Sequence, residues 1–277
     1  MSGRLGHRAR MLGRMATAWG RPGPDFIIIG AQKCGTTSLY NYLLRHPGIV
    51  AATKRSIKFF DHGPNWAKGV LWYRAHFPFA PARPGATDRP LVGECTPSYF
   101  VHPQGPARIR RIAPRARLMV LLRNPVDRAY SAYHHQRRKG REPLSFEAAL
   151  DHEQERVADE YRRLASERHF VARSYRLYSY VGWGHYAEYL EPWLRTFPRE
   201  QILIMLTDDL AADPAGVLTK VHAFLGLPSA RLDDYPRLNA GRYDSLEPYL
   251  RKRLLEHFEP HNRRLAAVLG RDPGWTS

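Results

Sequence analysis

The feature that most constrains the fold is a short apolar run that stops at a glycine and is followed by a helical pattern. Residues 26–29 are one phenylalanine and three isoleucines, and Gly30 ends the run. A continuous apolar run of this length is typical of a strand that is buried on both faces. Leu39, Tyr42 and Leu43 then follow at helical spacing. The pattern predicts a buried strand, a turn and a helix.

The same arrangement recurs in the middle of the chain. Residues 118–122 form a second apolar run that stops at Arg123. Asn124 can cap a helix there, with Pro125 at the first helical position, where its missing N–H costs nothing. Shorter runs of strand type occur at residues 91–93 and 202–206.

Amphipathic segments alternate with these strands. Apolar residues recur at helical spacing in residues 186–197 and 217–225. Residues 145–168 predict a mixed-charge helix that opens at Ser145, and its few apolar positions favour the surface. Buried strands alternating with helices predict an α/β fold in which helices cover both faces of a parallel sheet.

The loop between the first strand and its helix carries the strongest functional signal. It reads Gly30-Ala-Gln-Lys-Cys-Gly-Thr-Thr-Ser38. Backbone N–H groups, the helix N-terminus and Lys33 can together hold a phosphate-type anion. The loop departs from the Walker A pattern, because Lys33 lies inside it and Thr36 holds the place of the usual lysine. A glycine-containing turn with a solvated lysine is the alternative interpretation.

The charge of the chain favours anionic partners. Its 277 residues hold 43 Lys and Arg against 26 Asp and Glu, a formal net charge of +17. Residues 108–141 alone contain eleven Arg and Lys against one acid, Asp127. Such a balance attracts polyanions, acidic membranes or anionic small molecules. Two cysteines, Cys34 and Cys95, are too few for a disulfide framework, and we therefore expect a cytoplasmic protein.

The first 24 residues carry five arginines and no acid. Their apolar runs are too short for a signal-peptide core or a membrane span. We expect a disordered basic tail over residues 1–24 and a single domain over residues 25–277. A transit peptide or a membrane-surface arm is the alternative for the tail.

Four segments together resemble one known family. Residues 24–39 resemble the 5′-phosphosulfate loop of sulfotransferases of the heparan sulfate or carbohydrate type, in a bacterial-like form. These enzymes use 3′-phosphoadenosine 5′-phosphosulfate (PAPS). Residues 123–131 resemble the family's 3′-phosphate motif, and residues 93–99 resemble the segment that carries its catalytic glutamate. Residues 239–243, with Leu269 and Gly270 further on, resemble the end of bacterial members.

The resemblance implies a P-loop-like, three-layer fold and sulfuryl transfer from PAPS, which leaves 3′,5′-diphosphoadenosine. The acceptor would be a small molecule or glycan that offers a hydroxyl, with an amine as the alternative. Glu94 and Lys33 would be catalytic. The residues that would bind the donor are Lys33, Cys34, Gly35, Thr36, Thr37, Ser38, Arg123, Ser131, Gly241 and Arg242.

Physical chemistry supports two of these roles independently. Arg123 ends a strand at the sheet edge where α/β proteins bind ligands, and its guanidinium group matches phosphate oxygens in pairs. An ion pair with Asp127 is the alternative. Glu94 ends the strand at 91–93, where a carboxylate can take a proton from an incoming hydroxyl. A solvated or ion-paired glutamate is the alternative there.

One segment departs from the family pattern. The family commonly has Lys-Lys-Glu-Pro-His-Phe-Phe, whereas residues 54–60 have Ser56 and Lys58 in place of the glutamate and the histidine. The acceptor is therefore open. We expect Lys54, Arg55 and Lys58 to bind a polar or anionic acceptor.

No metal site is expected from the sequence. His257 and His261 stand four apart, but Pro260 lies between them, and the cysteines lack zinc-site spacing. Two other functions stay open. Asp208 follows the apolar run at 202–206, as the metal-holding aspartate follows a strand in magnesium-dependent P-loop nucleotide kinases and NTPases, and such an enzyme is the second candidate. A nucleic-acid-binding protein ranks last, since no nucleic-acid module is recognisable, and we expect neither a nucleic-acid partner nor a membrane span.

Overall fold

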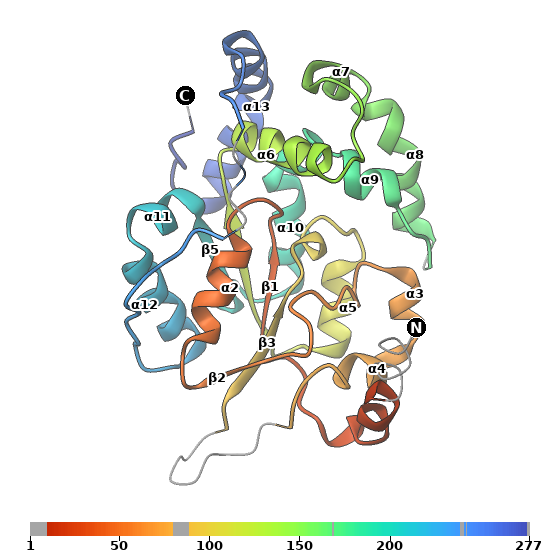
Figure 1. The fold of residues 1–277 in the computed structure, drawn as a ribbon, viewed down its shortest axis with the longest axis vertical. Helices are drawn as coiled ribbons and strands as arrows, with labels where there is room; N and C mark the ends of the chain where they lie inside the picture. The colour runs from red at the N-terminus through yellow and green to blue at the C-terminus, as the bar shows by residue number, and fades with distance from the viewer. Residues whose placement is uncertain (1–9, 80–88, 168, 239–240, 242, 276–277) are drawn as a thin grey trace.

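The computed structural model describes residues 10–79, 89–167, 169–238, 241 and 243–275. A parallel sheet with the strand order β2-β3-β1-β4-β5 occupies the centre of this part of the chain (Figure 1). The predicted α/β fold with a parallel sheet is thereby confirmed. The strands are β1 (Phe26–Gly30), β2 (Ile49–Ala51), β3 (Leu91–Cys95), β4 (Arg117–Leu122) and β5 (Ile202–Leu206).

Helices cover the sheet on both sides. In Figure 1, α2, α11 and α12 lie on one side of the strands and α5 lies on the other, while α6 crosses beyond their carboxyl ends. The α-helices are α2 (Thr36–Leu44), α3 (Gly63–Trp66), α4 (Gly69–Arg74), α5 (Gly105–Ile112), α6 (Pro125–Arg138), α7 (Phe146–Asp151), α8 (Glu153–Ser166), α9 (Arg173–Tyr178), α10 (Tyr186–Thr196), α11 (Thr207–Ala212), α12 (Pro214–Leu225) and α13 (Pro248–Leu269). Short 3₁₀ helices are η1 (Ala18–Gly20), η2 (Pro97–Tyr99), η3 (Gly182–Gly184) and η4 (Arg199–Gln201).

Strand β1 is the centre of the core, and all five of its residues are buried. It pairs with β3 on one side and with β4 on the other, both in parallel. Phe26 lies opposite Gly93, where an added Cβ would come within 2.4 Å of the Phe26 ring. The carboxyl ends of β1, β3 and β4 therefore meet at one edge of the sheet.

The prediction of one surface helix over residues 145–168 is wrong in two respects. The segment divides at His152 into α7 and α8. Phe146 and Leu150 are buried in a cluster with α6 and α13, so that α7 packs into the core rather than on the surface. Ser145 does cap α7, accepting a hydrogen bond from the Ala148 N–H. A few apolar residues on one helical face suffice for this burial.

The N-terminal segment is packed where disorder was expected. Residues 10–16 are helical. The Arg14 guanidinium group donates hydrogen bonds to the carbonyl oxygens of Ala75 and Phe77, and Arg21 donates to Phe77 as well. The expectation of disorder is therefore wrong for residues 10–24, whereas residues 1–9 lie outside the described residues. Among the described helices, none combines the length and apolarity that crossing a membrane would require.

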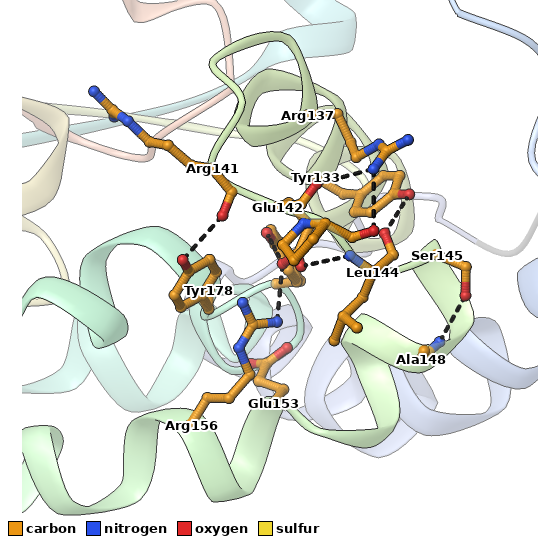
Figure 2. Close-up of polar contacts among 12 residues, drawn as sticks. Tyr133, Arg137, Arg141, Glu142, Leu144, Ser145, Ala148, Glu153, Arg156 and Tyr178 are labelled. Atoms are coloured by element: carbon orange, nitrogen blue, oxygen red, sulfur yellow. Dashed lines mark hydrogen bonds and ion pairs between the residues drawn. The ribbon is translucent and has the colours of Figure 1, made fainter.

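A buried carboxylate fixes the loop that follows α6 (Figure 2). Glu142 accepts hydrogen bonds from Arg156 Nη1 at 2.9 Å and from the Tyr180 hydroxyl at 2.8 Å. Its other oxygen accepts from the Leu144 N–H at 3.2 Å. The Glu142 side chain is fully buried, while that of Arg156 is 19% exposed. This network holds the end of α6 against α8 and the chain around Tyr180.

We predict that Glu142→Ala destabilises the protein strongly. Removing one partner of a buried ion pair leaves the other charge unpaired, at a cost of about 3–5 kcal/mol in the free energy of unfolding. Urea denaturation measures this loss. Glu155→Ala is the matched control, because Glu155 is exposed and lies in a surface pair with His152; we expect it to change stability by less than about 0.5 kcal/mol. Equal losses in both variants would refute the role of the Glu142 network.

Candidate active site

A cavity of about 910 Å³ opens at the carboxyl edge of the sheet. Its walls come from the loop after β1, the start of α2 and one face of α6, and from Arg237, Leu238, Gly241 and Tyr243. Segments that are distant in the sequence thus converge on one space. Ten of the residues predicted for the site line it: Lys33, Gly35, Thr36, Thr37, Ser38, Arg55, Lys58, Arg123, Ser131 and Gly241.

The loop after β1 is shaped by two residues with left-handed backbone conformations. Lys33 has a φ of 71° and Gly35 has a φ of 85°, and α2 begins at the next residue, Thr36. A helix N-terminus with unpaired N–H groups therefore faces the cavity, together with the Lys33 side chain. Beneath the loop, the Thr207 hydroxyl donates to the Cys34 carbonyl oxygen at 2.9 Å. The side chain of Cys34 itself is fully buried and does not line the cavity.

Arg123 occupies the end of β4, as the sequence predicted. The alternative ion pair with Asp127 is weak, because Arg123 Nη2 lies 4.0 Å from the Asp127 carboxylate, while Arg251 Nη2 lies at 2.7 Å. Asn124 caps α6 by accepting a hydrogen bond from the Val126 N–H. Ser131 lies on the same helix and lines the cavity with Arg123.

The site also holds basic residues that were not predicted from the sequence, among them His135, Arg138 and Lys139. His135 and Arg138 follow Ser131 at i+4 and i+7, which places them on the same face of α6, and Lys139 continues the cavity wall. That spacing was visible in the sequence and could have identified them. The other lining residues that were not predicted are Gln32, Tyr42, Ser56, Pro97, Thr207, Leu210, Ala211, Arg237, Leu238 and Tyr243.

Crowding of positive charge changes the titration of two groups here. Burial, together with the nearby Arg138 and Arg123 guanidinium groups, lowers the pKa of Lys33 to about 8. Burial and the positive charge of Lys33 lower the pKa of His135 to about 4, so that His135 is neutral near pH 7. An anion in the cavity would relieve this repulsion.

Glu94 does not line the cavity. Its carboxylate is fully buried and accepts hydrogen bonds from the hydroxyls of Tyr73 at 2.7 Å and Tyr99 at 3.1 Å, and from the Ile57 N–H at 3.2 Å. The Thr96 hydroxyl donates to the same carboxylate at 2.7 Å. Burial raises the pKa of Glu94 to about 7, although these hydrogen bonds act in the opposite direction.

A pair of hydroxyl groups connects Glu94 to the cavity. The Ser56 hydroxyl, which lines the cavity, donates to Thr96 Oγ1 at 3.2 Å. Thr96 in turn donates to Glu94 Oε2. Both hydrogen bonds point toward the carboxylate, which is the direction a proton would take from the cavity to Glu94.

The residues predicted for the acceptor fall into two groups. Arg55 lines the cavity and donates to Thr37 Oγ1 at 2.6 Å. Lys58 also lines it, and burial lowers its pKa. Lys54 is exposed and is not part of the wall. Arg242, predicted to bind the donor, lies outside the described residues.

Comparisons with known proteins agree on one family. The family profile described as "Sulfotransferase domain" matches residues 23–255. Human heparan sulfate glucosamine 3-O-sulfotransferase 6 is 32% identical, over 91% of this chain and 73% of its own length. Mouse bifunctional heparan sulfate N-deacetylase/N-sulfotransferase 2 is 30% identical over 90% of this chain, which spans 30% of that protein. The crystal structure of a sulfotransferase from Alicyclobacillus acidocaldarius superposes with a TM-score of 0.71, at 32% identity, over 92% of this chain and all of that chain.

We predict that Lys33 titrates near pH 8 in the empty protein and at higher pH with sulfate present. The bound anion favours the charged amine, so its pKa rises. Competitive acetylation across a pH series, followed by mass spectrometry of the Lys33 peptide, measures this pKa. Arg138→Ala removes one neighbouring positive charge and should raise the pKa of Lys33 in the empty protein. A pKa near 10.5 without sulfate would contradict the prediction.

Proposed function

Because the chain belongs to the sulfotransferase domain family, we propose that it transfers a sulfuryl group from PAPS to a hydroxyl of a carbohydrate or of a glycosylated or polyketide-type metabolite. The observation that carries the proposal is the meeting of Lys33, Arg123 and Ser131, from separate segments, in one cavity. That convergence is what a donor with anionic groups on both the 5′ and the 3′ oxygen of its ribose requires. An amine is the alternative acceptor.

We assign one part of the cavity to the 5′-phosphosulfate of PAPS and another part to its 3′-phosphate. The loop after β1, with Lys33 and the N-terminus of α2, would hold the 5′-phosphosulfate. Arg123 and Ser131 would hold the 3′-phosphate, through charge-assisted hydrogen bonds. A volume of about 910 Å³ suits a ligand of nucleotide size. Cys34 would contribute only its backbone.

Lys33 would also assist the transfer itself. As the sulfur leaves the phosphate, negative charge grows on the bridging oxygen. A charged Lys33 and the N–H groups at the start of α2, which border the cavity, would stabilise that charge. Binding would also hold the acceptor hydroxyl opposite the leaving phosphate, and this orientation of the reactants would raise the rate of transfer further.

The acceptor is proposed to be polar or anionic. Two relatives named above act on heparan sulfate, an acidic carbohydrate. In this chain, Arg55 and Lys58 bring positive charge to the cavity beside Ser56. A role for Lys54 in binding the acceptor stays a prediction, as does the cytoplasmic location.

We assign the base to Glu94 acting through the Ser56–Thr96 pair. As the acceptor oxygen bonds to sulfur, its proton passes to Ser56 Oγ, the Ser56 proton passes to Thr96 Oγ1, and the Thr96 proton passes to Glu94 Oε2. The carboxylate becomes a carboxylic acid, and both hydroxyl groups are restored. A pKa of about 7 suits a base that works at neutral pH.

The position of Asp208 does not support the alternative of a nucleotide kinase. Asp208 follows β5 but is absent from the cavity wall, and its carboxylate accepts a hydrogen bond from Trp275 Nε1 at 3.1 Å. A nucleotide kinase would need a carboxylate on its magnesium ion, beside the phosphates.

We predict sulfate transfer from PAPS in the presence of excess EDTA, because lysine and arginine side chains supply the positive charge that a kinase takes from magnesium. Radiolabelled transfer to a panel of carbohydrate acceptors measures this activity. A strict requirement for magnesium, or hydrolysis of ATP, would overturn the proposal.

The matched variant for donor recognition is Arg123→Ala. Loss of a charge-assisted contact costs about 1.5–3 kcal/mol, so 3′,5′-diphosphoadenosine should bind about 10- to 150-fold more weakly. AMP lacks the 3′-phosphate, and its affinity should barely change. Arg263→Ala is the control, since Arg263 is exposed and pairs with Glu259. Equal losses for both nucleotides would contradict the role of Arg123.

The proton path is tested by Thr96→Val, which keeps the shape and removes the hydroxyl. With saturating PAPS, the single-turnover rate should fall about 10²- to 10⁴-fold, the usual contribution of a general base. Thr96→Ser should restore much of it. Glu94→Gln should cost about as much, and the double variant little more, because the residues act as one unit. If Thr96→Val reacts normally while His135→Asn does not, His135 is the base and the proposed path is wrong.

A further inference from the structure

Three histidines from distant segments meet outside the cavity described above. His185 precedes α10, and His257 and His261 lie on α13. Each ring offers a nitrogen, and these three atoms all lie within 4.8 Å of one another. A second cavity, of about 660 Å³, adjoins them and shares no lining residue with the first. The family assignment does not account for this cluster.

Pro260 does not separate His257 from His261, contrary to the expectation from the sequence. Helix α13 runs from Pro248 to Leu269 without interruption, so Pro260 lies inside it. His257 and His261 are therefore one turn apart on the same helical face, the spacing at which two histidines can share an ion. His185 then completes the set from 72 residues away along the chain.

The geometry of the three rings is close to that of a metal site. His185 Nε2 and His257 Nε2 are 2.9 Å apart. The rings of His185 and His261 lie face to face, with centroids 3.8 Å apart. Zn–N bonds of about 2.1 Å in a tetrahedron place ligand nitrogens about 3.4 Å apart. Side-chain rotations that separate the hydrogen-bonded His185 and His257 nitrogens and turn the stacked His261 ring would bring the three nitrogens to that spacing.

A carboxylate lies beside the cluster in a supporting position. Glu188 Oε1 is 3.4 Å from His261 Nδ1 and 3.9 Å from His185 Nδ1. A carboxylate that faces Nδ1 leaves Nε2 as the ligand atom and orients the ring, as is usual for metal-bound histidines.

We propose that His185, His257 and His261 bind one divalent transition-metal ion of the zinc type, with Glu188 as the positioning carboxylate. Imidazole nitrogen is a preferred ligand of zinc, and a three-histidine set leaves a fourth position for water or a small ligand. His185 and His257 also line the second cavity, from which a small ligand could reach the ion. The ion would join the start of α10 to the middle of α13.

The test is zinc titration of the untagged, metal-stripped full chain by calorimetry. We expect one ion per chain. His257→Ala and His261→Ala should each weaken zinc binding by at least about 100-fold, and Glu188→Gln by about 10- to 100-fold. His152→Ala is the matched control, since His152 is exposed and lies outside the cluster; we expect it to leave zinc affinity unchanged.

Spectroscopy distinguishes a built site from surface binding. Cobalt in the wild-type protein should give the visible absorption of a four-coordinate ion, and His257→Ala should abolish it. His257 is exposed, so this variant is expected to fold. Zinc affinity that is unchanged in both histidine variants, or lowered equally by His152→Ala, would overturn the proposal.

Discussion

The parallel pairing of β1 with β3 and β4 is the constraint on which the site depends. Parallel strands deliver their carboxyl ends to the same edge of a sheet, so the chain must leave all three strands in one place. There it continues into the loop that holds Lys33, into Thr96, and into Arg123. Because its run of isoleucines is apolar throughout, β1 is buried on both faces. This burial fixes the position of the sheet edge relative to the core.

Positive charges gathered at this edge work against the stability of the empty protein. Burial and the nearby Arg138 and Arg123 guanidinium groups lower the pKa of Lys33 to about 8, so that Lys33 loses its charge at a lower pH than a free amine does. The surrounding fold must hold these cations together, and the buried Glu142 network does so at the end of α6, just beyond Arg138 and Lys139. A ligand that neutralises the cavity would therefore stabilise the fold by binding the native state.

The features that sequence patterns predicted correctly are those that interactions between neighbouring residues determine. The strands at 26–29 and 118–122, the Asn124 cap and the loop between β1 and α2 all depend on neighbours in the sequence, and the structure has them as predicted. Anion binding by that loop stays a prediction. Strand β2 was missed because three residues at a sheet edge carry little pattern. The burial of Glu94 was not predicted, for another reason. Glu94 is buried by the phenols of Tyr73 and Tyr99, and no local signal reveals which tyrosines will cover a carboxylate.

Placing Glu94 behind two hydroxyl groups makes electrostatic sense for the proposed reaction. A bare carboxylate inside the cavity would compete with an anionic donor for Lys33 and Arg123, and it would raise the energy of the bound phosphosulfate. Behind Thr96, the negative charge is held by buried donors and is separated from the donor site. Ser56, which stands where the resembling family has a glutamate, supplies the hydroxyl group that links the cavity to Thr96 in the proposed path. The substitution at Ser56 and the burial of Glu94 would then be two parts of a single arrangement.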